Sequence, residues 1–236
     1  MEHNKENENK DEKNKNKSIE EIKEVGAVLP EEKKKDNGIQ VLTIIGQIEG
    51  HSVQPPQTKT TKYEHMIPQL IDLEQNDKIK GILFVLNTVG GDVEAGLAIA
   101  EMIRSLKKPT VSLVIGGGHS IGVPLATASQ YSFISPSATM IIHPIRMNGL
   151  VIGVPQTFKY FNKMQERIND FIIRTSGIKL EVLKEMMMQT DELLNDMGTI
   201  LVGEEAVECG LINEVGGVKE SLDKLNSLIK DNEIEP

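Results

Sequence analysis

The chain has 236 residues, with 26 Lys+Arg against 35 Asp+Glu, a net charge of −9 and 39% hydrophobic residues. This composition suits one globular domain of moderate size, and an acidic body with 3 Tyr, 5 Phe and no Trp argues against nucleic acid as a partner. No apolar run approaches the ~20 residues of a membrane helix, so we predict a cytoplasmic protein without stable membrane insertion.

Charge divides the chain into a leader and a folded part. The first 36 residues hold 9 Lys and 11 acidic residues, and such a segment cannot bury enough apolar surface to offset its ordering entropy. We therefore predict a disordered charged leader over residues 1–37, a folded domain over 38–217, and a C-terminal helix and tail over 218–236.

The first half of the folded part alternates strand and helix patterns. β-Branched runs bounded by glycine, asparagine or proline predict strands, and apolar residues at helical spacing predict helices. Predicted strands are Ile39–Ile45, Ile79–Leu86 and Thr110–Ile115. Predicted helices are Met66–Gln75 and Val93–Ser105, with a loop over His51–Lys62 and a turn over Gly116–Gly118. This alternation indicates an α/β fold with mostly parallel pairing.

The second half continues with shorter elements. It predicts strands at Tyr131–Ile134, Thr139–Ile142 and Leu211–Val215, and helices at Ile121–Ser129, Phe158–Thr175, Leu180–Gln189 and Gly203–Gly210. Asn148–Gly153 is an apolar segment flanked by glycine, and Gln189–Gly203 reads as a polar stretch between helices.

Gly118–Gly122 matches the G-x-S-x-G pattern, in which a serine occupies a tight turn between a strand and a helix. The preceding strand and the following small-residue helix favour Ser120 as a nucleophile over a plain helix cap.

A serine nucleophile needs a base, and His143, at the end of a predicted strand, is the favoured candidate. His119 adjoins Ser120 and is less favoured, because neighbouring side chains in a strand or tight turn generally diverge. The order Ser120, His143, acid excludes an α/β-hydrolase, in which the acid precedes the histidine. Asp191 and Asp196 are the candidate acids, and each could equally be a surface charge or a helix cap.

Two further features carry weaker signals. Gly90-Gly91 is either a bare turn or a pair whose backbone N–H groups approach a ligand and a developing oxyanion. The single cysteine, Cys209, permits no internal disulfide and no thiolate metal cluster, and we interpret it as a structural thiol.

Four ordered blocks resemble the ClpP-like serine peptidase family, and in particular its translocation-enhancing branch. They are Asn87–Gly91 with Ala95-Gly96, Ser120 in its glycine-rich turn, Met140–Pro144, and Gly203–Leu211. The resemblance runs from about Ile39 to Val215. It implies an α/β superhelix of ββα units, as in crotonases, with an additional handle helix at Phe158–Thr175 and a homo-oligomeric ring that can stack with another.

The same resemblance implies the roles of individual residues. Ser120 is the implied nucleophile and His143 the implied base, while the backbone N–H groups of Gly91 and Ile121 form the oxyanion hole. The implied substrate-binding residues are Gly90, Asn148, Gly149 and Leu150, which contact an extended peptide. No cofactor or metal is implied.

Departures from the family pattern concern the acid and the partner. In the family, the acid stands a fixed short distance before the Glu-Ala-Val-Glu block. The same distance without a gap leads to Gly198 in this chain, whereas a shift of two residues selects Asp196 and a larger shift selects Asp191. Leu83 and Val85 stand where the family often shows tyrosines that help dock ATPase loops, which disfavours docking of a Clp ATPase.

The leading hypothesis is a serine endopeptidase that cleaves peptides or unfolded proteins, with a link to preprotein translocation or to degradation of signal peptides and preproteins. One alternative is a catalytically weak ring that serves as a scaffold. Another is a crotonase-type acyl-CoA enzyme, although that family commonly uses carboxylates where this chain has serine and histidine.

Overall fold

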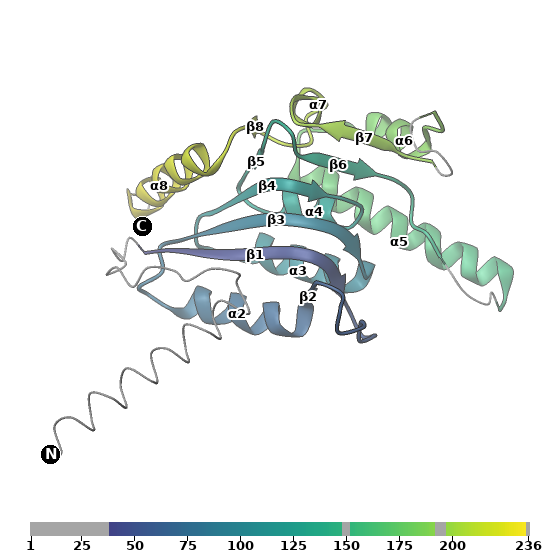
Figure 1. Cartoon of the computed structure of the whole chain (residues 1–236), viewed down its shortest axis with the longest axis horizontal. Helices are drawn as coiled ribbons and strands as arrows, with labels where there is room; N and C mark the ends of the chain where they lie inside the picture. Colours follow the sequence, from purple (N-terminus) through teal and green to yellow (C-terminus); the bar gives the residue numbers. More distant parts are fainter. Residues whose placement is uncertain (1–37, 148–151, 192–196, 235–236) are drawn as a thin grey trace, which may run out of the picture. The chain divides into compact units, whose positions relative to one another are not determined.

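The computed structural model describes residues 38–147, 152–191 and 197–234, which form a mixed α/β unit (Figure 1). The strands are β1 Ile39–Glu49, β2 Thr60–Lys62, β3 Gly81–Gly91, β4 Thr110–Gly118, β5 Tyr131–Ile134, β6 Thr139–Ile142, β7 Thr199–Val202 and β8 Glu214–Val215. The helices are α2 Tyr63–Gln75, α3 Val93–Ser105, α4 Gly122–Thr127, α5 Val154–Thr175, α6 Leu180–Met188, α7 Glu204–Glu208 and α8 Val218–Ile234.

The sheet has the order β2-β1-β3-β4-β5-β8, and all of these neighbours are parallel. β6 branches from the end of β4 through one parallel pair, Gly117 with Thr139, and pairs with β7 in antiparallel register. Parallel pairing requires crossovers, which α2, α3 and α4 supply. The expected α/β class with mostly parallel strands is confirmed.

Helices cover both faces of the sheet, which explains the nearly continuous apolar sequence of β3 and β4. On one face, α2, α3 and α4 enclose a large core that includes Ile44, Phe84 and Leu86. On the other, Leu225 of α8 packs in a smaller cluster with Leu83, Val111, Leu113 and Phe133. Leu83, which stands at a position proposed for partner docking in the family, is therefore covered by the chain itself.

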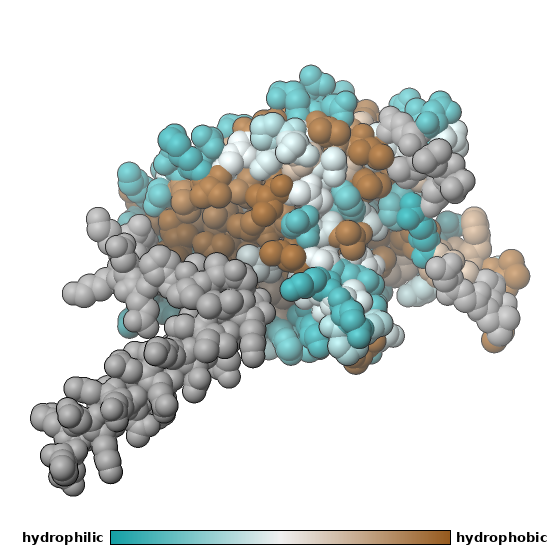
Figure 2. Space-filling view, viewed as in Figure 1, coloured by the Kyte–Doolittle hydropathy of each residue, from teal (hydrophilic) through white to brown (hydrophobic). Residues whose placement is uncertain are grey.

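Part of the second face is exposed and apolar. Val41 and Ile45 on β1 and Ile115 on β4 each expose more than 40% of their surface. Figure 2 shows apolar side chains gathered over β1, β3 and β4, beyond the area that α8 covers. Such a patch is typical of a surface that meets another protein.

The largest differences from the predicted elements lie at strand ends. The predicted turn Gly116–Gly118 is wrong, because these glycines continue β4, and Gly117 N–H donates to Asn87 Oδ1 at an N–O distance of 2.9 Å. β3 likewise extends through Gly91, and β1 extends to Glu49. β7 was not expected, since its four residues follow a polar stretch and gain their strand character from pairing with β6.

Among the residues whose structure is described, no helix is both long and apolar enough to cross a membrane.

Candidate active site

A cavity of about 220 Å³ opens where β3, β4 and β6 end. Parallel strands bring their carboxyl ends to one edge of a sheet, which is where α/β proteins commonly bind ligands. The residues that line the cavity come from four parts of the chain: β3 and the start of α3 (Val89, Gly91, Val93), the turn after β4 (Ser120, Ile121, Val123), β6 and the segment after it (Ile142, His143, Pro144, Ile145, Arg146), and α5 with α6 (Gln165, Ile168, Ile172, Met187). The predicted nucleophile, base and oxyanion-hole residues therefore share one cavity.

Ser120 occupies a strained turn. Its φ of +57° is the single positive value among the described residues other than glycine, and the left-handed region costs such residues about 1–2 kcal/mol. The turn is held by Ser120 N–H, which donates to Ile141 O at 2.8 Å, and by His119 N–H, which donates to Thr88 O at 3.1 Å. This strand-turn-helix geometry is that of a nucleophile elbow.

Glycines allow β3 and α3 to approach this turn closely. A Cβ built on Gly90 would lie 2.7 Å from Ser120 Cβ and 2.8 Å from His119 O. A Cβ on Gly96 of α3 would lie 2.5 Å from Ile121 Cγ1. Gly90 is therefore a support under the serine turn, and Gly91, which follows it, lines the cavity itself.

His143 presents a defined edge of its imidazole. Nδ1 lies 2.7 Å from the backbone oxygen of Pro144, and a carbonyl oxygen only accepts hydrogen bonds. Nδ1 is therefore the protonated nitrogen, and Nε2 of the neutral ring carries the lone pair that a general base requires.

His119 is bonded elsewhere. Its Nε2 lies 2.8 Å from Thr139 Oγ1 on β6. Burial, reinforced by the nearby His143, lowers the pKa of His119 below its usual value of 6.5. At neutral pH the His119 ring consequently stays uncharged.

Of the two candidate acids, only Asp191 lies among the described residues. Asp191 is exposed just after α6 and does not line the cavity described above. Asp196 lies outside the described residues, as do Asn148, Gly149 and Leu150. Gly198, at the ungapped family position of the acid, has a φ of +140° and donates its N–H to Gln189 O at 2.7 Å. The identity of the acid therefore stays a prediction.

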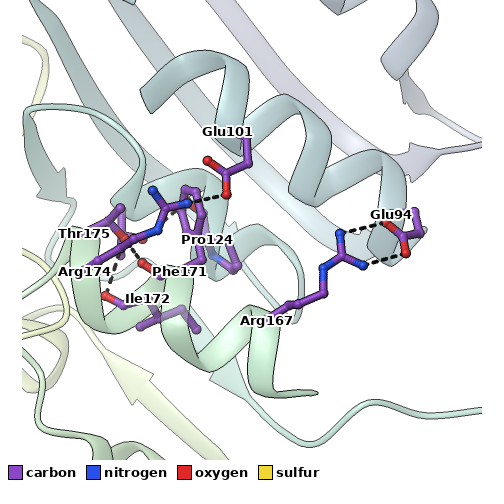
Figure 3. A network of polar contacts seen from close by, with 9 residues as sticks. Glu94, Glu101, Pro124, Arg167, Phe171, Ile172, Arg174 and Thr175 are labelled. Carbon is purple, nitrogen blue, oxygen red and sulfur yellow. Dashed lines mark hydrogen bonds and ion pairs between the residues drawn. The ribbon is translucent and has the colours of Figure 1, made fainter. Parts of the chain in front are cut away.

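The helix that closes the cavity, α5, is tied to α3 by two ion pairs (Figure 3). Arg167 and Glu94 form a bidentate pair, with N–O distances of 2.8 and 3.1 Å, and Arg174 pairs with Glu101 one heptad further along both helices. The Arg167 hydrogen bonds lower the pKa of Glu94 despite some opposing desolvation. Because Gln165, Ile168 and Ile172 come from α5, these pairs help set the shape of the cavity.

We expect Arg167→Met to lower the free energy of unfolding by less than ~1 kcal/mol at neutral pH, because both partners are about half exposed. In the folded state the pKa of Glu94 lies below its usual value of 4.5, so this contribution is present above about pH 4.5 and is lost as the pH falls through the lowered value. Urea unfolding of the wild type and the variant measures it.

The exposed Lys163→Met on the same helix is the control for this measurement. Roughly 1 M salt shortens the screening length to about 3 Å and should shrink the difference between wild type and Arg167→Met. A difference that persists unchanged at high salt would mean that Arg167 acts through packing of its stem and not through its charge.

Sequence reasoning missed the residues that α5 and α6 contribute. Gln165, Ile168 and Ile172 lie on one face of α5, and their three- and four-residue spacing was the available signal, although it equally describes core packing. Met187 of α6 also lines the cavity. Cys209 is half-buried, and burial raises the pKa of its thiol, as suits a structural cysteine.

Comparisons with known proteins find one matching family and several similar proteins. The family model for Clp protease matches residues 37–219. The translocation-enhancing protein TepA of Halalkalibacterium halodurans is 57% identical over 212 residues, which span 90% of this chain and 82% of that protein. An ATP-dependent Clp protease proteolytic subunit of Leuconostoc citreum is 30% identical over 50% of this chain and 62% of its own length. Proteolytic subunit 1 of Protochlamydia amoebophila is 27% identical, over 64% and 72%.

Proposed function

Because the chain belongs to the Clp protease family, we propose that it is a serine endopeptidase that cleaves peptides or unfolded proteins at the cavity around Ser120. The observation that carries this proposal is one cavity lined both by a serine in a left-handed turn and by a histidine, His143, whose Nδ1 carries the proton. The described residues thus supply the two groups that form and resolve an acyl-enzyme.

The chemistry follows from these two groups. Ser120 Oγ attacks the peptide carbonyl carbon while His143 Nε2 takes the hydroxyl proton. The C–N bond then breaks as the same nitrogen returns the proton to the leaving amine. Water hydrolyses the ester in a second cycle of proton transfer through His143. The backbone N–H groups of Gly91 and Ile121 stabilise the oxyanion, a role that their place beside Ser120 supports.

The lining of the cavity favours an apolar substrate side chain. Val123, Ile142, Ile168, Ile172 and Met187 are buried or nearly buried side chains that line it, with Gln165 and Arg146 as polar members. An apolar residue of an extended peptide fits this surface, since its transfer from water is favourable. We propose that Gly90 and residues 148–150 flank the backbone of that peptide, as in strand-addition recognition.

Assembly into a homo-oligomeric ring is part of the proposal. The first half of α5 exposes Val154, Phe158 and Tyr160, and the sheet exposes Val41, Ile45 and Ile115. These apolar surfaces support contacts with further copies of the chain. The relative named for translocation enhancement suggests that the physiological substrates are signal peptides or preproteins.

Fluorophosphonate labelling tests the proposal directly. We expect the purified, assembled protein to gain the mass of one phosphonyl group per chain at Ser120, and Ser120→Ala to gain none. Ser105→Ala, an exposed serine whose hydroxyl caps the end of α3, is the matched control and should label like the wild type. An assembled wild type that does not label would favour the scaffold hypothesis instead.

A further inference from the structure

One peptide group connects His143 to α5. The backbone oxygen of Pro144 receives the hydrogen bond from His143 Nδ1 at 2.7 Å. The N–H of Ile145 belongs to the same peptide plane and donates to Gln165 Oε1, with an N–O distance of 2.8 Å. The two ends of a single rigid, planar unit are thus bonded, one to the imidazole and the other to the Gln165 side chain.

Gln165 is itself held in place. Its Nε2 donates to Asn169 Oδ1 at 2.9 Å, one helical turn further along α5, and lies 3.4 Å from the sulfur of Met187 on α6. Asn169 exposes only 5% of its surface. A half-buried amide that is bonded at both its oxygen and its nitrogen has few alternative rotamers, so its oxygen marks a fixed point for the peptide.

We propose that Gln165 is a positioning residue that fixes the orientation and tautomer of His143 through the Pro144–Ile145 peptide. The inference rests on the proposed function, because it concerns the base of that reaction. It assigns to an uncharged side chain on α5 a role in holding the imidazole in the arrangement described, in which Pro144 O accepts the Nδ1 proton.

Gln165 can act on His143 in two ways: it polarises the Pro144–Ile145 peptide, and it keeps that peptide from rotating. A hydrogen bond at the peptide N–H increases the negative charge on its oxygen, and such chains of hydrogen bonds strengthen one another. When His143 takes the serine proton, the imidazolium faces the negative end of this peptide and a charge-assisted bond forms at Nδ1. Without Gln165 the peptide is free to rotate, and Nδ1–H is held less firmly.

The test compares Gln165→Met with Gln165→Glu in the full-length, assembled protein. Methionine keeps the length of the side chain but removes the acceptor, whereas glutamate keeps an acceptor oxygen. We expect Gln165→Met to lower kcat about tenfold, the value of one hydrogen bond, with a smaller change in KM, since Gln165 also lines the cavity. We expect Gln165→Glu to restore most of kcat. Glu166→Met, at the exposed neighbouring position, is the control and should behave as the wild type.

A second readout does not depend on peptidase activity. Histidine 15N chemical shifts, assigned with His143→Gln, report which ring nitrogen carries the proton. The wild type should show the Nδ1–H form of His143, and Gln165→Met a mixture of both tautomers. The chemical-shift measurement remains possible even if the assembled protein cleaves nothing. Failure of the peptidase proposal is therefore distinguishable from failure of the proposed role of Gln165. An unchanged tautomer in Gln165→Met, or a loss of kcat that glutamate does not restore, would overturn the positioning role.

Discussion

Ser120→Ala and His143→Ala are each expected to lower kcat for peptide cleavage by about 10⁴- to 10⁶-fold, with little change in KM. Either change removes a group that acts in the transition state and contributes little to substrate binding. Neither side chain belongs to the apolar core, so circular dichroism and the oligomer size should match those of the wild type.

A double variant tests whether Ser120 and His143 act together. A nucleophile and its base work as one unit, so Ser120→Ala with His143→Ala should be about as slow as either single variant, and not slower by the product of the two losses. His51→Ala, an exposed histidine that contacts Tyr63 away from the cavity, is the control. Multiplicative losses would contradict a shared mechanism and indicate that one of the two residues acts only through folding.

The same kinetics identify the acid. Asp196→Asn and Asp191→Asn keep size while removing charge. Neutralising the aspartate that orients the base costs about 10⁴-fold in such triads. The proposed choice, Asp196, predicts that this variant falls by that order while the exposed Asp191→Asn retains activity. Full activity in both variants would mean that no charged acid is needed and would increase the importance of the Gln165 contact.

Local signals in the sequence were sufficient for the elements that carry the chemistry. Apolar residues at helical spacing predicted α3 over Val93–Ser105, and the structure shows the side chain of Asp92, the preceding residue, accepting from Ala95 N–H at 2.8 Å. The G-x-S-x-G pattern located the turn at Ser120, and the left-handed backbone there is the geometry that pattern requires. In both cases the signal lies within a few residues of the feature.

Features that arise from distant pairing were not predictable in this way. Gly116–Gly118 look like a turn, yet they extend β4 because Asn87, about thirty residues earlier, and β6 supply hydrogen bonds. Gln165 was missed because a glutamine on an amphipathic helix is ordinarily a surface residue, and its partner Ile145 is 20 residues away in sequence. The choice of Asp196 over Asp191 stays a prediction for a related reason, since the family spacing fits neither aspartate without a gap.

Gly90→Ala is expected to lower kcat by about 10²-fold or more while the protein still folds. The new Cβ would lie 2.7 Å from Ser120 Cβ and 2.8 Å from His119 O, both closer than any van der Waals contact allows. His119 O is a backbone atom that also accepts from Gly122 N–H at 2.8 Å, so it cannot retreat without moving the start of α4. The serine turn must shift, and a displacement of about 1 Å is enough for that loss of rate.

Stability should fall as well, because Gly90 has a φ of +87° and alanine there is strained by about 1–2 kcal/mol before any overpacking. Gly217→Ala is the matched control, since its Cβ would meet only Glu220 Oε2 at 3.6 Å and it lies at the start of α8, away from the cavity. Urea unfolding and fluorophosphonate labelling rates separate the two effects. If Gly90→Ala loses stability but labels at the wild-type rate, the turn has adapted around the methyl group, and Gly90 is a folding residue and not a support of the nucleophile.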